Sequence, residues 1–294
     1  MGTVTTDRRV AVVIPSLTGR VDAVLASVAR QVPRPDEVEV VVGIRPNGRA
    51  RNLGAARTTA PILVFVDDDA VLTGDRVLAD LVAPLGSDAT IGAAGAAKLL
   101  PPGSSRFQRR VAREVPRIEH PVVDHVVESN PPLGRHGYTD VTTTCCAMPR
   151  AVFDECGGFD DDLVRGVDSE LFYRVRTAGY RLVLAPHASV HHPAPATLSA
   201  LLAKHFLYGA GYAGTVQRHP ALAAGRFLRT PAHTVAYLLA RTALLVPNMV
   251  IPYSHAAPSW RPGFRPLKAL TSYAAALGYA YGWYRYPYRR KPDA

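Results

Sequence analysis

Ile62-Leu63-Val64-Phe65-Val66-Asp67-Asp68-Asp69 is the stretch of this sequence that decides the fold, because five apolar residues run directly into three carboxylates. A continuous apolar run rich in β-branched and aromatic residues is typical of a strand buried on both faces of a parallel sheet. Asp is unfavourable in strands, and adjacent carboxylates repel one another. We therefore expect the strand to end at Val66 and the carboxylates to hold a divalent cation. Ligands of open α/β sheets bind at this carboxyl edge. A solvated acidic turn is the alternative.

Strand and helix patterns alternate before this run. Strands are predicted at residues 10–14, 38–42 and 62–66, and helices between them at 20–31 and 49–59. The order β-α-β-α-β predicts a parallel, doubly wound sheet, and therefore an α/β fold.

Further elements are predicted after the acidic run. Helices are expected at 75–85 and 168–178, a helical turn at 150–156, and strands at 91–100, 141–148 and 182–184. The proline-broken, charged stretch 101–132 is expected to be an irregular, mobile loop over a site.

The net charge of +10 is unevenly distributed. Residues 196–294 contain twelve Lys and Arg but one acidic residue, with ten of the thirteen Tyr and both Trp, whereas residues 1–195 have a net charge of −1. We therefore expect a near-neutral domain at 1–195 and a basic, aromatic helical extension at 196–294.

The cysteine content and the N-terminus bear on location. Cys145, Cys146 and Cys156 offer no paired framework, which fits a reducing compartment. The first nine residues lack an apolar signal core. No uncharged apolar stretch reaches the roughly 18 residues of a spanning helix. These features predict a cytoplasmic protein.

Four segments occur together in an order that resembles the family 2 glycosyltransferases of GT-A fold. They are Val12-Val13-Ile14-Pro15-Ser16, Arg51-Asn52-Leu53-Gly54, Val66-Asp67-Asp68-Asp69, and Gly157-Gly158-Phe159-Asp160 followed by Gly166-Val167-Asp168-Ser169-Glu170-Leu171-Phe172-Tyr173-Arg174. With Pro186 and His192, the resemblance covers residues 8–195. It implies a mostly parallel sheet flanked by helices, here with a C-terminal helical extension.

The resemblance also implies roles for individual residues. Asp69 is similar to the family's direct Mn²⁺ or Mg²⁺ ligand, and His192 to the histidine that reaches the metal or the diphosphate. Asp67 corresponds to a ribose or nucleotide contact. Asp68 is grouped with the donor residues, although its side chain is expected to point away. The other residues that the resemblance places at the nucleotide-sugar donor are Pro15, Ser16, Arg49, Arg51 and Asn52. Arg49 and Arg51 could instead be exposed cations, and His191 is expected to be structural.

Asp168 corresponds to the family's catalytic base, which takes the proton of the acceptor hydroxyl. The alternative is that Asp168 and Glu170 only favour a helix N-terminus. The chain departs from the family twice. Val167 stands where an acidic residue usually precedes the base. The second strand ends at Val42, where the family usually has an acid that contacts the nucleotide base. The base is therefore left open, and the donor is expected to be a UDP- or GDP-sugar.

The C-terminal extension combines apolar and aromatic segments with basic residues, Arg285, Arg289, Arg290 and Lys291 among them. Such segments are typical of helices in an anionic membrane interface. Nucleic-acid binding is disfavoured because the aromatic residues stand among Ala, Leu and Val. A plain helical subdomain or a dimer interface is the alternative.

The predicted function is that of an inverting glycosyltransferase acting on a lipid-linked or cell-envelope acceptor, peripheral on the inner face of the cell membrane. One rival is a catalytically weakened binding or scaffold protein. Another is a sugar-1-phosphate nucleotidyltransferase, which needs a more glycine-rich, basic loop than residues 15–20 provide.

Overall fold

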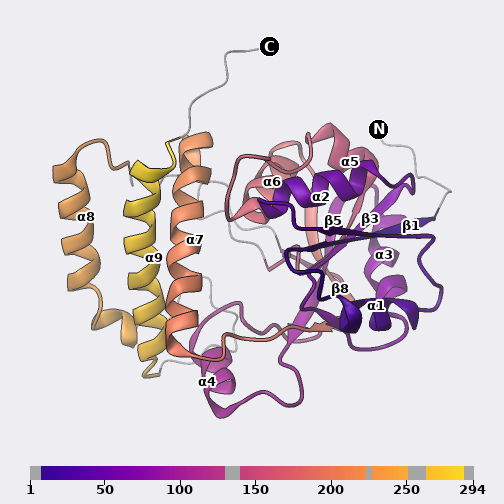
Figure 1. Cartoon of the computed structure of the whole chain (residues 1–294), viewed down its shortest axis with the longest axis horizontal. Coiled ribbons are helices and arrows are strands. Elements are labelled where there is room, and N and C mark those ends of the chain that lie inside the picture. The colour runs from indigo at the N-terminus through magenta and orange to yellow at the C-terminus, as the bar shows by residue number, and fades with distance from the viewer. Residues whose placement is uncertain (1–7, 130–139, 223–226, 251–262, 288–294) are drawn as a thin grey trace. The chain divides into compact units, whose positions relative to one another are not determined.

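The computed structural model describes residues 8–129, 140–222, 227–250 and 263–287. The chain divides into two compact units. The described residues of the first lie within 1–102, 119–132 and 137–193. Those of the second lie within 103–118 and 194–294. A segment from the middle of the chain therefore belongs to the same unit as the C-terminal third (Figure 1).

The first unit is built on one sheet of eight strands. These are β1 (Val10–Ser16), β2 (Glu37–Val42), β3 (Ile62–Val66), β4 (Val71–Leu72), β5 (Ile91–Leu99), β6 (Val127–Glu128), β7 (Cys145–Pro149) and β8 (Arg181–His191). Their order is β2-β1-β3-β7-β5-β8-β4, with β6 paired to β8. The α/β class is confirmed.

The sheet is mixed in strand direction. As predicted, β1 pairs in parallel with both β2 and β3. By contrast, β7 runs antiparallel to both β3 and β5, and β4 and β6 are antiparallel to β8. An apolar run predicts a buried strand but not its direction, which depends on the edge from which the connecting segment enters the sheet.

Both faces of the sheet are buried. Alternate residues of β3 enter two different cores, with Val64 and Val66 in one and Leu63 and Phe65 in the other. The first core is covered by α1 (Asp22–Ala29) and α3 (Val77–Ser87). The second is covered by α2 (Asn47–Ala56), α5 (Arg150–Glu155) and α6 (Val167–Thr177). Figure 1 shows these helices on the two sides of the strands.

Two parts of the predicted element pattern were wrong. The stretch 101–132 is not wholly irregular, since it contains α4 (Arg106–Glu114) and β6. Ser105 and Gln108 form a capping box at the start of α4, a signal that was readable in the sequence. The predicted strand 182–184 is the beginning of β8, which continues past Pro186 to His191. Its pairing with β5 shifts register there, so the strand accommodates the proline.

The second unit consists of helices. Besides α4 they are α7 (Leu198–Arg218), α8 (Pro231–Ala243) and α9 (Pro266–Arg285), with short 3₁₀ turns at Pro220–Leu222 and Pro247–Met249. Within this unit α9 lies between α7 and α8 (Figure 1). None of the helices in the described ranges is both long and apolar enough to cross a membrane.

Helices α7 and α9 touch through their backbones. A Cβ on Gly209 of α7 would lie 1.9 Å from the carbonyl oxygen of Ala275, and a Cβ on Gly278 of α9 would lie 1.9 Å from that of Phe206. No side chain fits at either position, so the two glycines set the spacing of the helices. At the start of α9, the buried carboxylate of Glu114 accepts a hydrogen bond of 2.9 Å from the backbone N–H of Leu267, which ties α4 to α9.

The aromatic residues of α9 mainly pack inside this unit. Tyr279 is buried, and its ring contacts those of Tyr212, Tyr237 and Trp283. Helix α9, part of the extension whose composition predicts a membrane interface, is therefore the central helix of the bundle. The tyrosines that remain exposed on and just after this helix are Tyr281, Tyr284 and Tyr286.

Candidate functional site

The three consecutive aspartates follow β3 at the carboxyl edge of the sheet, and each has a different partner. Asp67 accepts a hydrogen bond of 2.6 Å from Nη2 of Arg51. Asp68 accepts one of 2.6 Å from the hydroxyl of Ser16, at the end of β1. Asp69 lies 3.4 Å from Nε2 of His192. Asp68 is therefore turned toward a different part of the site from Asp67 and Asp69, so the three carboxylates do not all meet at one point.

Asp67, Asp69 and His192 form a group that could hold a metal ion. One ligand atom from each lies within 4.8 Å of the others. The pairing of β4 with β8, in which Val71 faces His191, brings the end of β8 beside the acidic turn. Two carboxylate oxygens and one imidazole nitrogen suit Mn²⁺, and the oxygens suit Mg²⁺. Asp69 is exposed, so the site is open on that side.

Arg51, on α2, forms a buried ion pair with Asp67. Its side chain is only 3 % exposed, and its guanidinium lies 5.5 Å from the ring centre of Phe159. Its Nε is buried without a hydrogen-bond partner. Arg51 is thus no exposed cation, and its observed contact is with Asp67 rather than toward solvent. Arg49, on the same helix, is exposed.

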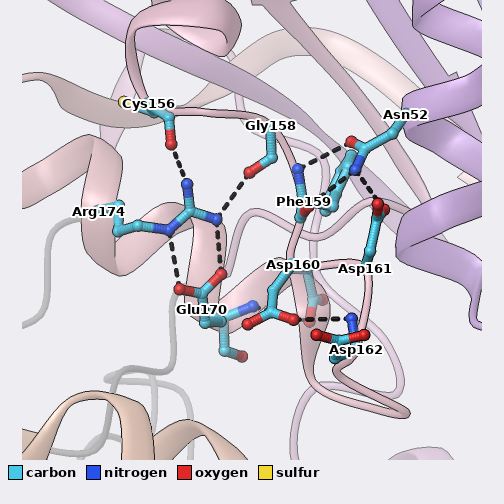
Figure 2. Close-up of polar contacts among 11 residues, drawn as sticks. Asn52, Cys156, Gly158, Phe159, Asp160, Asp161, Asp162, Glu170 and Arg174 are labelled. Atoms are coloured by element: carbon cyan, nitrogen blue, oxygen red, sulfur yellow. Dashed lines mark hydrogen bonds and ion pairs between the residues drawn. The ribbon is translucent and has the colours of Figure 1, made fainter. Parts of the chain in front are cut away.

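Asn52 joins α2 to the loop that precedes α6 (Figure 2). Its Nδ2 donates to the carbonyl of Phe159 and to the carboxylate of Asp161, both at 2.8 Å. Its Oδ1 accepts from the N–H of Phe159 at 2.9 Å. The side-chain amide of Asn52 is thus bonded within the protein, and it holds the loop at Phe159 and Asp161 against α2. Pro15, another residue expected at the donor, is buried within β1.

Asp168 lies in the first turn of α6, which follows Gly166 in the left-handed conformation. Its half-buried carboxylate accepts a hydrogen bond of 2.8 Å from the N–H of Ser169. Val167, in place of the usual acid, is buried in the second core. A Cβ on Gly48 would lie 3.3 Å from Val167, so an acid here would face packed apolar groups.

Cys145 and Cys146 lie on β7 beside β3. Burial raises the pKa of Cys145 to about 12, with a smaller contribution from Asp67. Burial also raises the pKa of Cys146, and the neighbouring Cys145 adds to this. Both cysteines are therefore buried, protonated residues of the core.

Glu170 and Arg174 form a clamp on α6 that the sequence did not single out (Figure 2). Arg174 donates to both oxygens of Glu170 at 2.8 and 2.6 Å, and to the carbonyls of Gly158, at 2.7 Å, and Cys156. Burial opposes the charged guanidinium, but Glu170 outweighs it and raises the pKa of Arg174. The Glu-x-x-x-Arg spacing is the readable signal for such a pair.

Arg174→Leu is expected to lower the free energy of unfolding by about 3 kcal/mol, because the carboxylate of Glu170, 3 % exposed, loses its partner. The matched variant Glu170→Gln/Arg174→Leu should lose less, since no charge remains buried. Urea unfolding monitored by circular dichroism measures both. Equal losses in the two variants would show that the ion pair does not carry the effect.

Comparison with known proteins shows which family the chain matches. Residues 5–206 match the model of a family described as "Glycosyltransferase like family 2". A protein of Sinorhizobium fredii (strain NBRC 101917 / NGR234), described as "Uncharacterized protein y4gI", is 27 % identical over 160 residues. That match covers 48 % of this chain and 16 % of the relative, so the chain spans about a sixth of that protein's length.

A solved structure resembles almost the whole chain. It is the mannosyltransferase PcManGT from Pyrobaculum calidifontis in complex with GDP-Man and Mn²⁺, with a TM-score of 0.56 and 18 % identity. The similarity covers 96 % of this chain and 89 % of that one. At this identity the similarity concerns the fold, and it confirms the predicted GT-A type.

Proposed function

Because this chain belongs to the glycosyltransferase-like family 2, we propose that it transfers a sugar from a nucleotide-diphosphate sugar to an acceptor hydroxyl, with inversion at the anomeric carbon. The observation that carries the proposal is the convergence of Asp67, Asp69 and His192 at the carboxyl edge of the sheet. The structural neighbour PcManGT was solved with GDP-Man and Mn²⁺, which supports a donor of this class.

Asp67, Asp69 and His192 are the residues that would hold Mn²⁺ or Mg²⁺. When bound, the metal neutralises the charge that develops on the departing diphosphate. Arg51 keeps Asp67 in place through the buried ion pair. Asp68 is hydrogen-bonded to Ser16 at the end of β1. Asp67 and Asp69 are therefore the two aspartates that face the donor.

Asp168 is the group we assign as catalytic base. It takes the proton of the acceptor hydroxyl as that oxygen attacks the anomeric carbon and the diphosphate leaves from the opposite face, so one displacement inverts the configuration. The Glu170–Arg174 clamp and the hydrogen bonds of Asn52 hold the two ends of the segment 156–161 that precedes α6. They therefore act as positioning contacts for the base.

The acceptor is proposed to be a lipid-linked or cell-envelope glycan, reached by a protein peripheral on the inner face of the cell membrane. The uneven charge supports this, since residues 196–294 hold eleven more basic than acidic residues. A catalytically weakened binding or scaffold protein is the alternative, and it rests on Val167 standing where an acid was expected.

A thermal-shift panel tests the donor class. We expect the melting temperature to rise with UDP or GDP only when Mn²⁺ or Mg²⁺ is present, because the metal bridges the protein and the diphosphate in the proposal. A ligand at 100 times its Kd stabilises the folded state by about 2.7 kcal/mol. EDTA should remove the shift, and adenosine diphosphate is the control. Absence of a shift with every nucleoside diphosphate and metal, together with no diphosphate release from nucleotide sugars, would contradict the proposal.

A further inference from the structure

Helix α8 of the second unit contacts α9 through the ring of Tyr237 and through several polar groups. Thr234 and Thr242 are hydrogen-bonded to the hydroxyls of Tyr284, at 2.6 Å, and Tyr273, at 3.0 Å. Arg241, the one charged residue of this helix, donates to the hydroxyl of Ser272 at 2.8 Å. Hydroxyl and guanidinium groups of α8 are thus bonded to three residues of α9.

The opposite side of α8 is apolar and exposed. Val235 is 57 % and Leu239 65 % exposed, and no residue of the helix is buried. The exposed apolar surface continues after the helix through Leu244 (43 %), Val246 (69 %) and Val250 (54 %). The outer face of a surface helix in a soluble protein usually carries polar residues, whereas Val235 and Leu239 are apolar. Exposed aliphatic side chains that recur along one segment indicate an interaction site.

The rest of the second unit is strongly basic. Its described residues include twelve Lys and Arg but one acidic residue, Glu114, whose buried carboxylate is bonded to Leu267 and Arg110. Exposed basic residues are concentrated on α4, at Arg106, Arg109, Arg110 and Arg113. The partner of this unit therefore offers both an apolar phase and negative charge.

We propose that the outer face of α8 and the segment after it, Val235, Leu239, Leu244, Val246 and Val250, inserts into the surface of an anionic lipid bilayer. A helix of thirteen residues is about 20 Å long, shorter than the ~30 Å hydrocarbon core. It therefore lies in the plane of the interface. Apolar insertion and basic attraction are the two contributions that hold a protein reversibly at such a surface.

A bilayer fits these observations better than a second copy of the chain. Two copies joined through α8 would bring together two units that each carry this excess of positive charge, and like charges oppose association. The role of this membrane binding, which is to bring a lipid-linked acceptor within reach, rests on the proposed function. Lipid binding itself requires no catalysis.

The test is co-sedimentation of the full chain with liposomes of phosphatidylcholine alone or with about 30 % phosphatidylglycerol. Binding should rise with phosphatidylglycerol and fall incompletely in 1 M NaCl, since salt screens charge but not apolar burial. Val235→Ser/Leu239→Ser/Val246→Ser should weaken binding more than about tenfold, because three aliphatic side chains lose their favourable transfer. The control, Val32→Ser/Val38→Ser/Val42→Ser, changes exposed valines of the first unit and should bind like the wild type.

The outcomes separate the possibilities. Undiminished binding of the α8 variant, or no binding by the wild type, would overturn the proposal. So would a wild-type dimer in analytical ultracentrifugation that the α8 variant loses, since the face would then join two copies. Release of nucleoside diphosphate, measured without lipid, should be the same for the wild type and the α8 variant. Liposome binding without any such release would overturn the proposed transferase function and leave the membrane surface standing.

Discussion

Asp168→Asn is expected to lower sugar transfer by about 10²–10⁴-fold, the usual contribution of a general base. The amide keeps the shape of the carboxylate and can still accept the hydrogen bond from the N–H of Ser169, but it cannot take the proton of the acceptor. The loss should appear in kcat, while the affinity for the donor should change little. Steady-state kinetics and a thermal shift with the nucleoside diphosphate measure the two effects separately.

Asp154→Asn, an exposed position on the neighbouring helix α5, is the matched control and should leave transfer unchanged. If Asp168→Asn turns over normally, or if its whole loss lies in donor binding, the base is another residue. Asp160 and Asp161 are then the next candidates. Glu170 is not, because its carboxylate is buried and bonded through both oxygens to Arg174.

Asp69→Asn is expected to lower transfer at least about 10²-fold, because a bound cation contributes several kcal/mol to the stabilisation of a departing anion. The side chain is exposed and lies next to two other carboxylates, so the free energy of unfolding should not fall. Titration of Mn²⁺ into the protein, followed by thermal shift, should show weaker binding than in the wild type. This second measurement does not depend on turnover.

Asp68→Asn provides the matched control for the metal site. Asp68 is a carboxylate in the same turn, but its partner is the hydroxyl of Ser16 and it is not in the metal-binding group. It should bind Mn²⁺ like the wild type. Equal Mn²⁺ affinity of Asp69→Asn and the wild type, or full transfer after EDTA treatment, would show that the metal is not held at Asp69.

The central strands were predictable from sequence because their signal is local. Burial on both faces goes with apolar residues along β3 and along β1 up to Pro15, and the carboxylates that follow β3 fix its end. The same holds for α6, whose first turn carries two acids and whose last turn carries two arginines. For these elements composition and position along the chain are sufficient.

The partners of the site residues were not predictable, because they depend on pairings far apart in sequence. From sequence, Arg51 is equally well interpreted as an exposed cation or as a ligand of the diphosphate, and only the packing of α2 on β1 and β2 shows it bonded to Asp67. His192 reaches Asp69 because β4 pairs with β8, and β4 has only two residues. So short a strand leaves no periodic pattern to detect.

The assignment of α4 to the second unit has a consequence for how this protein can be divided. The chain leaves the first unit near residue 103, forms α4, and returns near residue 119. A truncation at residue 195 would therefore not release an intact transferase module. It would leave the buried carboxylate of Glu114 without the first turn of α9, to which it is hydrogen-bonded. Recombination of such modules between proteins, in the laboratory or during descent, requires coordinated junctions near residues 103, 119 and 194 rather than a single one.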